Sequence, residues 1–423
     1  MNEKLLHFIW QFRLYDQQNL STVDGEKVEV IHTGYLNGDA GADFQNSKIQ
    51  IGKTLWAGNT EMHVNGKDWF AHNHQLDAAY NNVVLHVVYE PGDKPAMREN
   101  GQPIPTLALK GRINTNTLYR YEELSKRKAW IPCAGYIKNA GEFTVKNFEE
   151  RLLVERLEGK VEQINQLLAE SENDWENVMF QMIARYFGAS VNKEPFFRLA
   201  HTLPVKIWGK HQNDLLQLEA LLFGQAGFLE DRQDDEYPKQ LRKEYLYLKR
   251  LYSLQPLSSD MFKLLRLRPS NFPTLRLAQL AALMHKEVKM FSLILEAKTP
   301  KAIHDLLEFE VSAYWKEHYQ FDKPSKNVNC NLGSSMKNIL LINAVAPALF
   351  AYGKYKDNQE YCDRALELLQ QCKAESNSVI TGWKELEIEP ANAFESQALL
   401  QLKNNYCDKF RCLECAVGTK ILK

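Results

Sequence analysis

The most informative segment of the sequence reads GYLNGDAGADFQNSKIQI (34–51), LWAGNTEMHV (55–64) and HNHQLDAAYNNVVLHVVY (72–89). Acids and histidines are denser here, between runs typical of strands, than elsewhere in the chain. Side chains of these types bind metal ions or transfer protons. The residues in question are Asp39, Asp43, Glu61, His63, His72, His74 and Asp77.

In and around this segment, short apolar runs typical of strands alternate with polar loops, which predicts a β-sheet. Apolar residues at helical spacing predict a short helix over residues 3–15, and residues 34–41 are expected to form a loop. A short connection through Gly52 and Lys53 joins two of the predicted strands as a hairpin. The strands are expected at 28–32, 44–51, 55–64, 83–89 and 106–110. The continuous apolar run at 83–89 is typical of a buried strand.

The pattern changes after residue 112, where Pro132, Gly135 and Gly141 indicate turns and a domain boundary. Helical periodicity then dominates the chain. It is found at 148–168, 175–188, 213–229, 240–254, 274–296, 335–352, 359–373 and 391–403. We therefore predict an α+β protein with three parts. They are a mixed α/β domain (1–115), a linker region (116–145) and a mainly helical domain (146–423).

The composition is that of a soluble globular protein. Of the 423 residues, 44% are hydrophobic and 25% are charged, which excludes general disorder. The formal net charge of −1 excludes a surface that is basic all round. A nucleic acid therefore remains a possible partner only through a local basic patch.

We expect a cytoplasmic location without membrane association. Residues 1–15 carry charges among their apolar residues and lack a small-residue cleavage site, so they do not resemble a secretory signal. The longest apolar run, 339–352, is expected to be too short to span a bilayer. Seven cysteines, an odd number, fit a reducing compartment better than a disulfide framework.

The hairpin suggests a metal site. Glu61 and His63 are two residues apart on one strand, so they point to the same face of the sheet. Asp43 begins the preceding strand and lies beside them if the two strands pair. Two carboxylates and an imidazole form a suitable site for Mg²⁺ or Mn²⁺. Such an ion polarises a phosphodiester oxygen and lowers the pKa of a bound water.

This order of residues and elements resembles the core of the PD-(D/E)XK phosphodiesterase superfamily. An Asp begins one strand, a Glu-x-(basic) motif lies on the next strand, and a helix and another strand follow. The resemblance implies a restriction-endonuclease-like fold and metal-dependent cleavage of nucleic acid. Asp43 and Glu61 would be the metal-binding carboxylates. Gln75 or His74 stands where a following helix often adds a polar residue.

The sequence departs from that pattern in two places. Ala42 precedes Asp43 where the superfamily usually has a proline, and His63 stands where it has a lysine. His63 is compatible with a general base, with a metal ligand, or with loss of catalysis. The opposite interpretation of Asp43, Glu61 and His63 is a hydrogen-bonded sheet end without a metal.

The other polar residues of the segment also allow two interpretations. Asp39, His72, His74 and Asp77 are candidates for further ligands or phosphate contacts. Alternatively, the run beginning at His72 starts a helix, and Asp77 lies near its positive end. His86, within the apolar strand, is expected to be a core histidine rather than a ligand.

Three cysteines near the end of the chain form a second cluster. Cys407, Cys412 and Cys415 have a spacing at which thiolates share a zinc ion or an iron–sulfur cluster, with Cys133 or Cys330 as a fourth ligand. The alternative is a group of small, partly buried thiols in a helical domain.

A basic region is a candidate nucleic-acid surface. Its residues are Lys239, Arg242, Lys243, Lys249, Arg250, Lys263, Arg266, Arg268 and Arg276. Tyr245, Tyr247 and Tyr252 lie among them and offer rings on which bases stack. The alternative is the solvated face of two helices.

Read as a whole, the chain resembles a bacterial family, domain-of-unknown-function family 2851. The matching stretches include LHFIW (6–10), NGDAGADF (37–44), WAGNTEMHV (56–64) and CLECAVG (412–418). That family implies no activity. The leading hypothesis is thus a metal-dependent nuclease, and the alternatives are an inactive scaffold that binds nucleic acid or protein, and a histidine-rich metal hydrolase acting on another substrate.

Overall fold

The computed structural model describes residues 1–423 apart from 127 and 232. Helix accounts for 54% of the chain and strand for 12%, with a mixed sheet in the N-terminal region and helices in most of the rest. These proportions confirm the α+β prediction. The described residues form two compact units, 1–148 with 402–423 and 149–401, which are considered separately.

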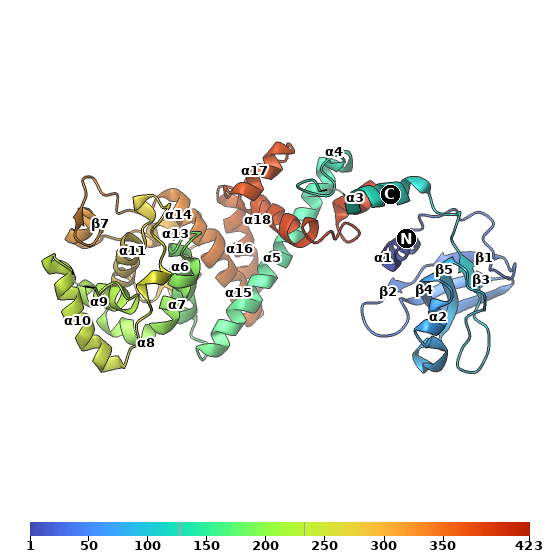
Figure 1. Ribbon diagram of the computed structural model, residues 1–423, viewed down its shortest axis with the longest axis horizontal. Coiled ribbons are helices and arrows are strands. Elements are labelled where there is room, and N and C mark those ends of the chain that lie inside the picture. The colour runs from blue at the N-terminus through green and yellow to red at the C-terminus, as the bar shows by residue number, and fades with distance from the viewer. Residues whose placement is uncertain (127, 232) are drawn as a thin grey trace. The chain divides into compact units, whose positions relative to one another are not determined.

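The first unit is built on a mixed sheet with the strand order β1-β3-β4-β5-β6, and β2 pairs with β3 (Figure 1). β3 is antiparallel to β1 and β4, whereas β5 is parallel to β4 and β6. The strands are β1 (Val28–His32), β2 (Tyr35–Leu36), β3 (Phe44–Ile51), β4 (Thr54–Asn65), β5 (Val83–Glu90) and β6 (Thr106–Ala108).

Local sequence explains how this sheet forms. Ile51 pairs with Thr54 at the β3–β4 hairpin, and Gly52 between them has a φ of +57°, which glycine adopts without a Cβ clash. Residues 83–88 of β5 are all buried because β5 lies between two parallel neighbours in the sheet. The parallel connection from β4 to β5 runs through α2, which also contacts β4.

Helices of the first unit come from both ends of the chain. They are α1 (Glu3–Gln11), α2 (Asp68–Ala71), η1 (His74–Leu76), η2 (Ala78–Tyr80), α3 (Thr115–Lys126), α4 (Ile137–Ala140), η8 (Leu402–Cys407) and α19 (Ala416–Leu422). α1 begins at the N-cap Asn2, whose side chain accepts a hydrogen bond from the Leu5 backbone N–H. It ends before Arg13, which has a φ of +53°, so the helix is shorter than the predicted 3–15.

The end of the chain contributes to the first unit. α19 contacts α3 and α4. The side chains of Thr117 and Arg120 on α3 donate hydrogen bonds to the carbonyls of Leu422 (3.3 Å) and Ile421 (2.9 Å). The residues predicted as a linker, 116–145, thus contain α3, α4 and the start of the next helix, and residues 402–423 belong to the unit that contains the sheet.

The second unit is mainly helical, apart from the small ribbon of β7 (His318–Gln320) and β8 (Lys323–Pro324). Its helices are α5 (Glu142–Glu170, which begins in the first unit), α6 (Trp175–Phe187), α7 (Lys193–Thr202), α8 (Val205–Trp208), α9 (Leu215–Gln225), α10 (Glu236–Tyr252), α11 (Pro273–Lys286), α12 (Met290–Glu296), α13 (Pro300–Leu306), α14 (Ser334–Leu340), α15 (Ala346–Lys356), α16 (Gln359–Gln371), α17 (Ser378–Glu385) and α18 (Ala393–Gln401). Shorter turns are η3 (Gly209–His211), η4 (Ser259–Met261), η5 (Pro269–Asn271), η6 (Ala313–Lys316) and η7 (Leu341–Val345).

The apolar run near residue 345 belongs to a longer helical segment than the sequence suggested. α14, the π-helical turn η7 and α15 together form a helix at 334–356, which is long and apolar enough to span a membrane. However, 78% of its apolar window is buried inside the protein, as is usual for a core helix. Pro347 lacks a backbone N–H for the preceding turn, and η7 lies directly before α15, which contains it.

Candidate metal centre

Asp43 and Glu61 lie together at one end of the β3–β4 pair. Phe44 pairs with Thr60, which places the two acids opposite each other. The Glu61 Oε2 atom accepts a hydrogen bond from the Asp43 backbone N–H (3.0 Å), and the Asp43 Oδ2 atom accepts one from the Met62 N–H (2.9 Å). An aspartate nitrogen lies at most about 5 Å from its own carboxylate oxygens, so these oxygens lie within about 8 Å of Glu61 Oε2.

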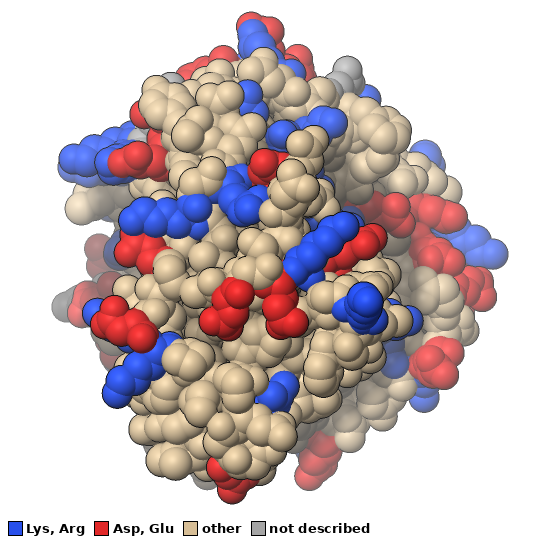
Figure 2. Space-filling model, turned by 90° about the vertical axis from the view of Figure 1, so that its right-hand side faces the viewer, with Lys and Arg blue, Asp and Glu red and all other residues tan. Residues whose placement is uncertain are grey.

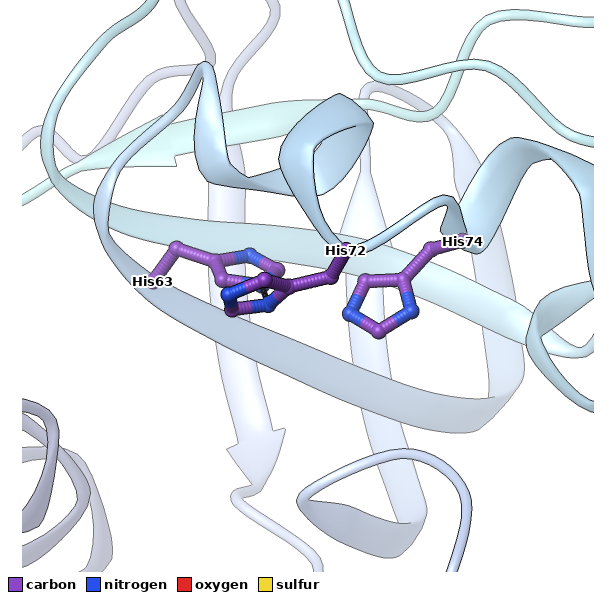
Figure 3. Close-up of side chains that lie close together, drawn as sticks. All are labelled: His63, His72 and His74. Atoms are coloured by element: carbon purple, nitrogen blue, oxygen red, sulfur yellow. Dashed lines mark hydrogen bonds between the residues drawn. The ribbon is translucent and has the colours of Figure 1, made fainter.

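Three histidines converge on one side of the sheet unit (Figure 3). His63 is on β4, His72 follows α2, and His74 opens η1. One ring nitrogen from each of the three lies within 4.8 Å of the others, and His63 Nε2 is 3.2 Å from His72 Nδ1. Nitrogens bound to one ion at about 2 Å lie about 3–4 Å apart, so a small adjustment would let all three ligate one metal.

Glu61 contacts both Asp43 and two of the histidines. Its Oε1 atom is 3.3 Å from His74 Nε2 and 3.7 Å from His63 Nε2. Burial raises the pKa of Glu61, and the neighbouring Asp43 carboxylate raises it further, whereas the His74 imidazole opposes this shift. A buried carboxyl group of this kind would be stabilised in its charged form by a divalent cation.

His86, on the neighbouring strand β5, contacts the ring of His63. Glu61 and His86 pair across β4 and β5, and His86 is fully buried. His63 Nδ1 lies 2.9 Å from His86 Nε2, so one of these nitrogens donates a proton to the other. If His63 donates, its Nε2 lone pair faces the cluster, which is the arrangement that metal-bound histidines adopt. The expectation of a core histidine at residue 86 fits its burial but omits this contact.

The two inner histidines are held in the neutral form. Burial, and then the neighbouring histidines, lower the pKa of His63 to about 4 and that of His86 to about 3. His86 Nδ1 is buried and has no hydrogen-bond partner among the described residues. Neutral imidazole is the form that ligates metals, so His63 is available as a ligand at neutral pH without losing a proton.

Aromatic rings close the inner side of the cluster, whereas its outer side reaches solvent. Trp69 is fully buried, with its ring centroid 5.3 Å from that of His74 and 5.2 Å from that of His86. Tyr80 stacks on His74 with centroids 3.8 Å apart. His72 is exposed, and the Asp43 side chain is 25% exposed. A substrate would therefore approach from the side of His72 and Asp43.

His7 is a site residue that the sequence did not indicate. It lies on α1, and its Nε2 atom is 3.2 Å from Asp43 Oδ2. Its ring also contacts the edge of Phe44, at a centroid distance of 5.8 Å. The only sequence feature that could have identified His7 is a histidine between buried residues of an amphipathic helix, which is a weak criterion by itself.

Three other predicted residues, Asp39, Asp77 and Gln75, differ in their burial and hydrogen bonding. Asp39 is exposed in the loop, where its backbone exchanges hydrogen bonds with Asn37. Asp77 caps η2, a turn separate from the one that begins at His74, by accepting a hydrogen bond from the Ala79 N–H (2.9 Å). Gln75 Oε1 is buried without a hydrogen-bond partner among the described residues.

The predicted basic residues lie in the second unit. On α10, Lys239, Arg242, Lys243 and Arg250 are exposed, and Lys249 is half-buried. Arg266 and Arg268 are exposed in the following loop.

Of the three tyrosines, only Tyr247 is exposed. Tyr245 is buried, and the hydroxyl oxygen of Tyr252 lies 2.8 Å from His211 Nε2.

Figure 2 shows basic and acidic side chains interspersed among the described residues of the face that it draws, without an extended area of one sign.

Comparison with known families matches residues 3–378 to the family described as "Protein of unknown function (DUF2851)". The match covers most of the chain, and the protein therefore belongs to this family, as its sequence suggested. No curated protein and no protein of solved structure matches it. The resemblance to PD-(D/E)XK enzymes therefore stays a prediction from the sequence.

Proposed function

We propose that the protein is a divalent-metal-dependent phosphodiesterase that cleaves nucleic acid, with its centre at Asp43, Glu61 and His63. The observation that carries the proposal is the position of Asp43 and Glu61 beside His63, fixed by one hydrogen bond from the Asp43 N–H to Glu61 and one from the Met62 N–H to Asp43. The order of elements also supports it. Asp43 precedes β3, Glu61 and His63 share β4, and α2 leads to the parallel strand β5.

The donor set favours Mn²⁺ over Mg²⁺. Asp43 and Glu61 offer oxygen atoms, which both ions accept, and His63 and His74 add imidazole nitrogens next to Glu61. Mg²⁺ prefers ligand sets made only of oxygen, whereas Mn²⁺ also accepts imidazole. When bound, the ion would polarise a phosphoryl oxygen and make a coordinated water more acidic.

The residues themselves would orient and hold this centre. His86 fixes the ring of His63, and with a pKa of about 4 His63 suits a ligand better than a general base at neutral pH. The Met62 N–H engages Asp43 Oδ2, which leaves the other carboxylate oxygen of Asp43 for the ion. Trp69 and Tyr80 exclude water from the inner side.

A metal hydrolase acting on another substrate is the second candidate. The observation that favours it is the trio of His63, His72 and His74, which can hold zinc without Asp43. The two candidates make opposite predictions for Asp43. Loss of this carboxylate would abolish cleavage by the first enzyme but spare most activity of the second.

The test is cleavage of labelled single- and double-stranded DNA and RNA by the full-length chain with Mg²⁺, Mn²⁺, Zn²⁺ or a chelator. We expect cleavage that requires Mn²⁺ or Mg²⁺ and falls at least ~100-fold in Asp43→Asn, the scale of losing a group that stabilises transition-state charge. Asp24→Asn, at an exposed position of the same unit, is the control.

Two other outcomes would change the proposed function. Absence of cleavage with every metal would overturn the phosphodiesterase proposal and favour the inactive scaffold. Stoichiometric zinc in the purified protein, with Asp43→Asn as active as the unchanged chain on a non-nucleic ester, would favour the second candidate.

Substrate binding is a further part of the proposal. We place the nucleic-acid contact on the exposed basic side chains of α10, with Tyr247 as the available stacking ring. Reversing the charge of Arg242 and Lys243 to glutamate should weaken binding and flatten its salt dependence. Equal binding by this variant and the unchanged chain would exclude α10 as the contact surface.

A further inference from the structure

The cysteines predicted as a metal site are divided between the two units. Cys133, Cys407, Cys412 and Cys415 belong to the first unit and Cys330 to the second, all as thiols rather than disulfides. Among the described residues, the side chains that lie close enough to hold one ion are the histidine trio of the candidate metal centre. A metal at these thiols therefore stays a prediction from the sequence.

The first unit also contains a cavity of about 520 Å³ beside the first half of β4, which we call the β4 cavity. Pairing of β4 with β5 begins at Asn59, so residues 54–58 have no strand partner on that side among the described residues. The turn at 98–102 contributes to the lining. A cavity of this volume accommodates a small organic ligand.

A glycine lets the chain before β5 lie close to β4 at this point. A Cβ atom added at Gly58 would lie 2.5 Å from Val84 Cγ1 and 2.6 Å from the Asn82 carbonyl oxygen. The same carbonyl accepts a hydrogen bond from the Asn59 N–H (2.9 Å). Backbone contacts therefore hold this wall of the β4 cavity without using the Asn82 side chain.

Arg98 holds the turn at 98–102 against the same segment. Its guanidinium group donates hydrogen bonds to the carbonyls of Asn81 (3.2 Å), Val83 (2.9 Å) and Pro103 (3.2 Å). The β4 cavity is thus formed in the unliganded chain, and a ligand would need little rearrangement to enter it.

The lining offers one aromatic ring for stacking. Trp56, on β4, is 41% exposed, whereas Trp69 of the candidate metal centre is fully buried. An exposed indole next to a cavity provides a flat face on which a planar ligand stacks.

Amide side chains of the lining are available for hydrogen bonds. Asn82 and Gln102 are exposed, and neither side chain makes a hydrogen bond to another residue that the structure describes. Each amide carries both donors and an acceptor, so together they match a ligand whose edge presents both kinds of group.

The charged groups of the lining are already engaged. Arg98 uses its guanidinium group on three carbonyls, and Glu99 accepts a hydrogen bond from the Asn81 amide at 3.0 Å. No lysine lines the β4 cavity among the described residues. The part of a ligand that enters it should therefore be uncharged, which excludes a phosphate group.

We propose that the β4 cavity binds one unpaired nucleobase of the substrate, stacked on Trp56 and hydrogen-bonded by Asn82 and Gln102. A nucleobase is planar and uncharged and has donors and acceptors along its edge, as this lining requires. The inference rests on the proposed function and extends it, because a base read at this position gives the cleavage a sequence preference.

The β4 cavity and the candidate metal centre share two elements. Trp56 and Glu61 both lie on β4, where at ~3.3 Å per residue their Cα atoms are about 16 Å apart. Asn81, which lines the cavity, directly follows Tyr80, which stacks on His74. One single strand can therefore reach both places, with the bound base a few nucleotides from the cleaved bond.

The test is titration of the metal-free, full-length protein with adenosine, guanosine, cytidine and uridine, followed by NMR of the nucleoside. We expect at least one nucleoside to bind, and Trp56→Ala to weaken that binding at least ~10-fold, the scale of losing a stacked base. Gln102→Leu should also weaken it. Leu55→Ala, at a 59% exposed position of the same strand that does not line the cavity, should leave it unchanged.

Three results would overturn the base site. They are no binding by any nucleoside, equal binding by Trp56→Ala and Leu55→Ala, and binding of a disaccharide such as maltose in place of nucleosides. The two proposals fail separately, because nucleosides contain no phosphodiester bond. Cleavage of nucleic acid without nucleoside binding would remove the base site alone. Trp56-dependent nucleoside binding without cleavage would support the base site and remove the phosphodiesterase.

Discussion

At the scale of single residues, the pair His63 and His86 makes stability depend on pH. In the metal-free folded protein both imidazoles are neutral at neutral pH, with pKa values of about 4 and about 3, whereas an unperturbed histidine has a pKa of 6.5. The unfolded chain therefore binds more protons below pH ~6.5. The free energy of unfolding should fall as the pH drops from about 6.5 towards 4, and it should be regained above pH 6.5.

The substitution His86→Gln tests this at one position. It removes one group with a depressed pKa, so the metal-free variant should lose less stability between pH 6.5 and pH 4 than the unchanged chain. Urea unfolding at several pH values measures the difference. His201→Gln, at an exposed histidine, should leave the slope unchanged. A slope as steep in His86→Gln as in the unchanged protein would contradict the assignment.

The sequence could predict those residues of the metal centre that lie close to one another along the chain. Glu61 and His63 are linked by the two-residue period of a strand, and Asp43 is linked to them by a short hairpin. His7 and His86 reach the cluster only through tertiary contacts, α1 on the sheet and β5 beside β4. No spacing in the sequence encodes such contacts, so both residues were missed as site residues.

At the scale of elements, the close approach of α9 and α10 depends on a glycine. A Cβ atom at Gly224 on α9 would overlap the ring of Tyr245 on α10, and both residues are buried. Gly224→Ala should therefore lower the free energy of unfolding by about 1–3 kcal/mol, as overpacking does. Thermal unfolding followed by circular dichroism measures the change.

Gly159→Ala is the matched control for that prediction. Gly159 is exposed on α5, and an added Cβ atom would meet no atom within 4 Å. Alanine should stabilise this helix by up to ~1 kcal/mol. Stabilisation by both substitutions would show that helix propensity, rather than contact with Tyr245, determines the effect.

Elements with strong periodicity were predicted closely. β1 and β3 have the predicted bounds, β4 is longer than predicted by one residue at each end, and β5 is longer by one residue at its C-terminal end. α7, α13 and α17 were missed because they are short and only part of each faces the core. For such helices the apolar pattern is too brief to exceed that of a loop.

At the scale of the whole molecule, the end of the chain completes the unit in which the chain begins. Ile421 and Leu422 are buried, and α3 donates hydrogen bonds to their carbonyls. Sequence alone could not reveal this return because residues 149–401 separate the two parts of the first unit.

Deletion of residues 402–423 should therefore destabilise the sheet while sparing the second unit. Hydrogen exchange should accelerate at the β5 amides and change little at the amides of α9 in the same sample. Unchanged protection of β5 would show that the sheet folds independently of the end of the chain.

The central claim is that phosphodiester cleavage depends on the carboxylate of Glu61. The most direct measurement is the rate of Mn²⁺-dependent cleavage by Glu61→Gln, compared with Glu29→Gln at an exposed position on β1 of the same sheet. A fall of at least ~100-fold in folded Glu61→Gln, with Glu29→Gln unchanged, is the predicted result. Equal rates in the two variants, or no cleavage by the unchanged protein, would contradict it.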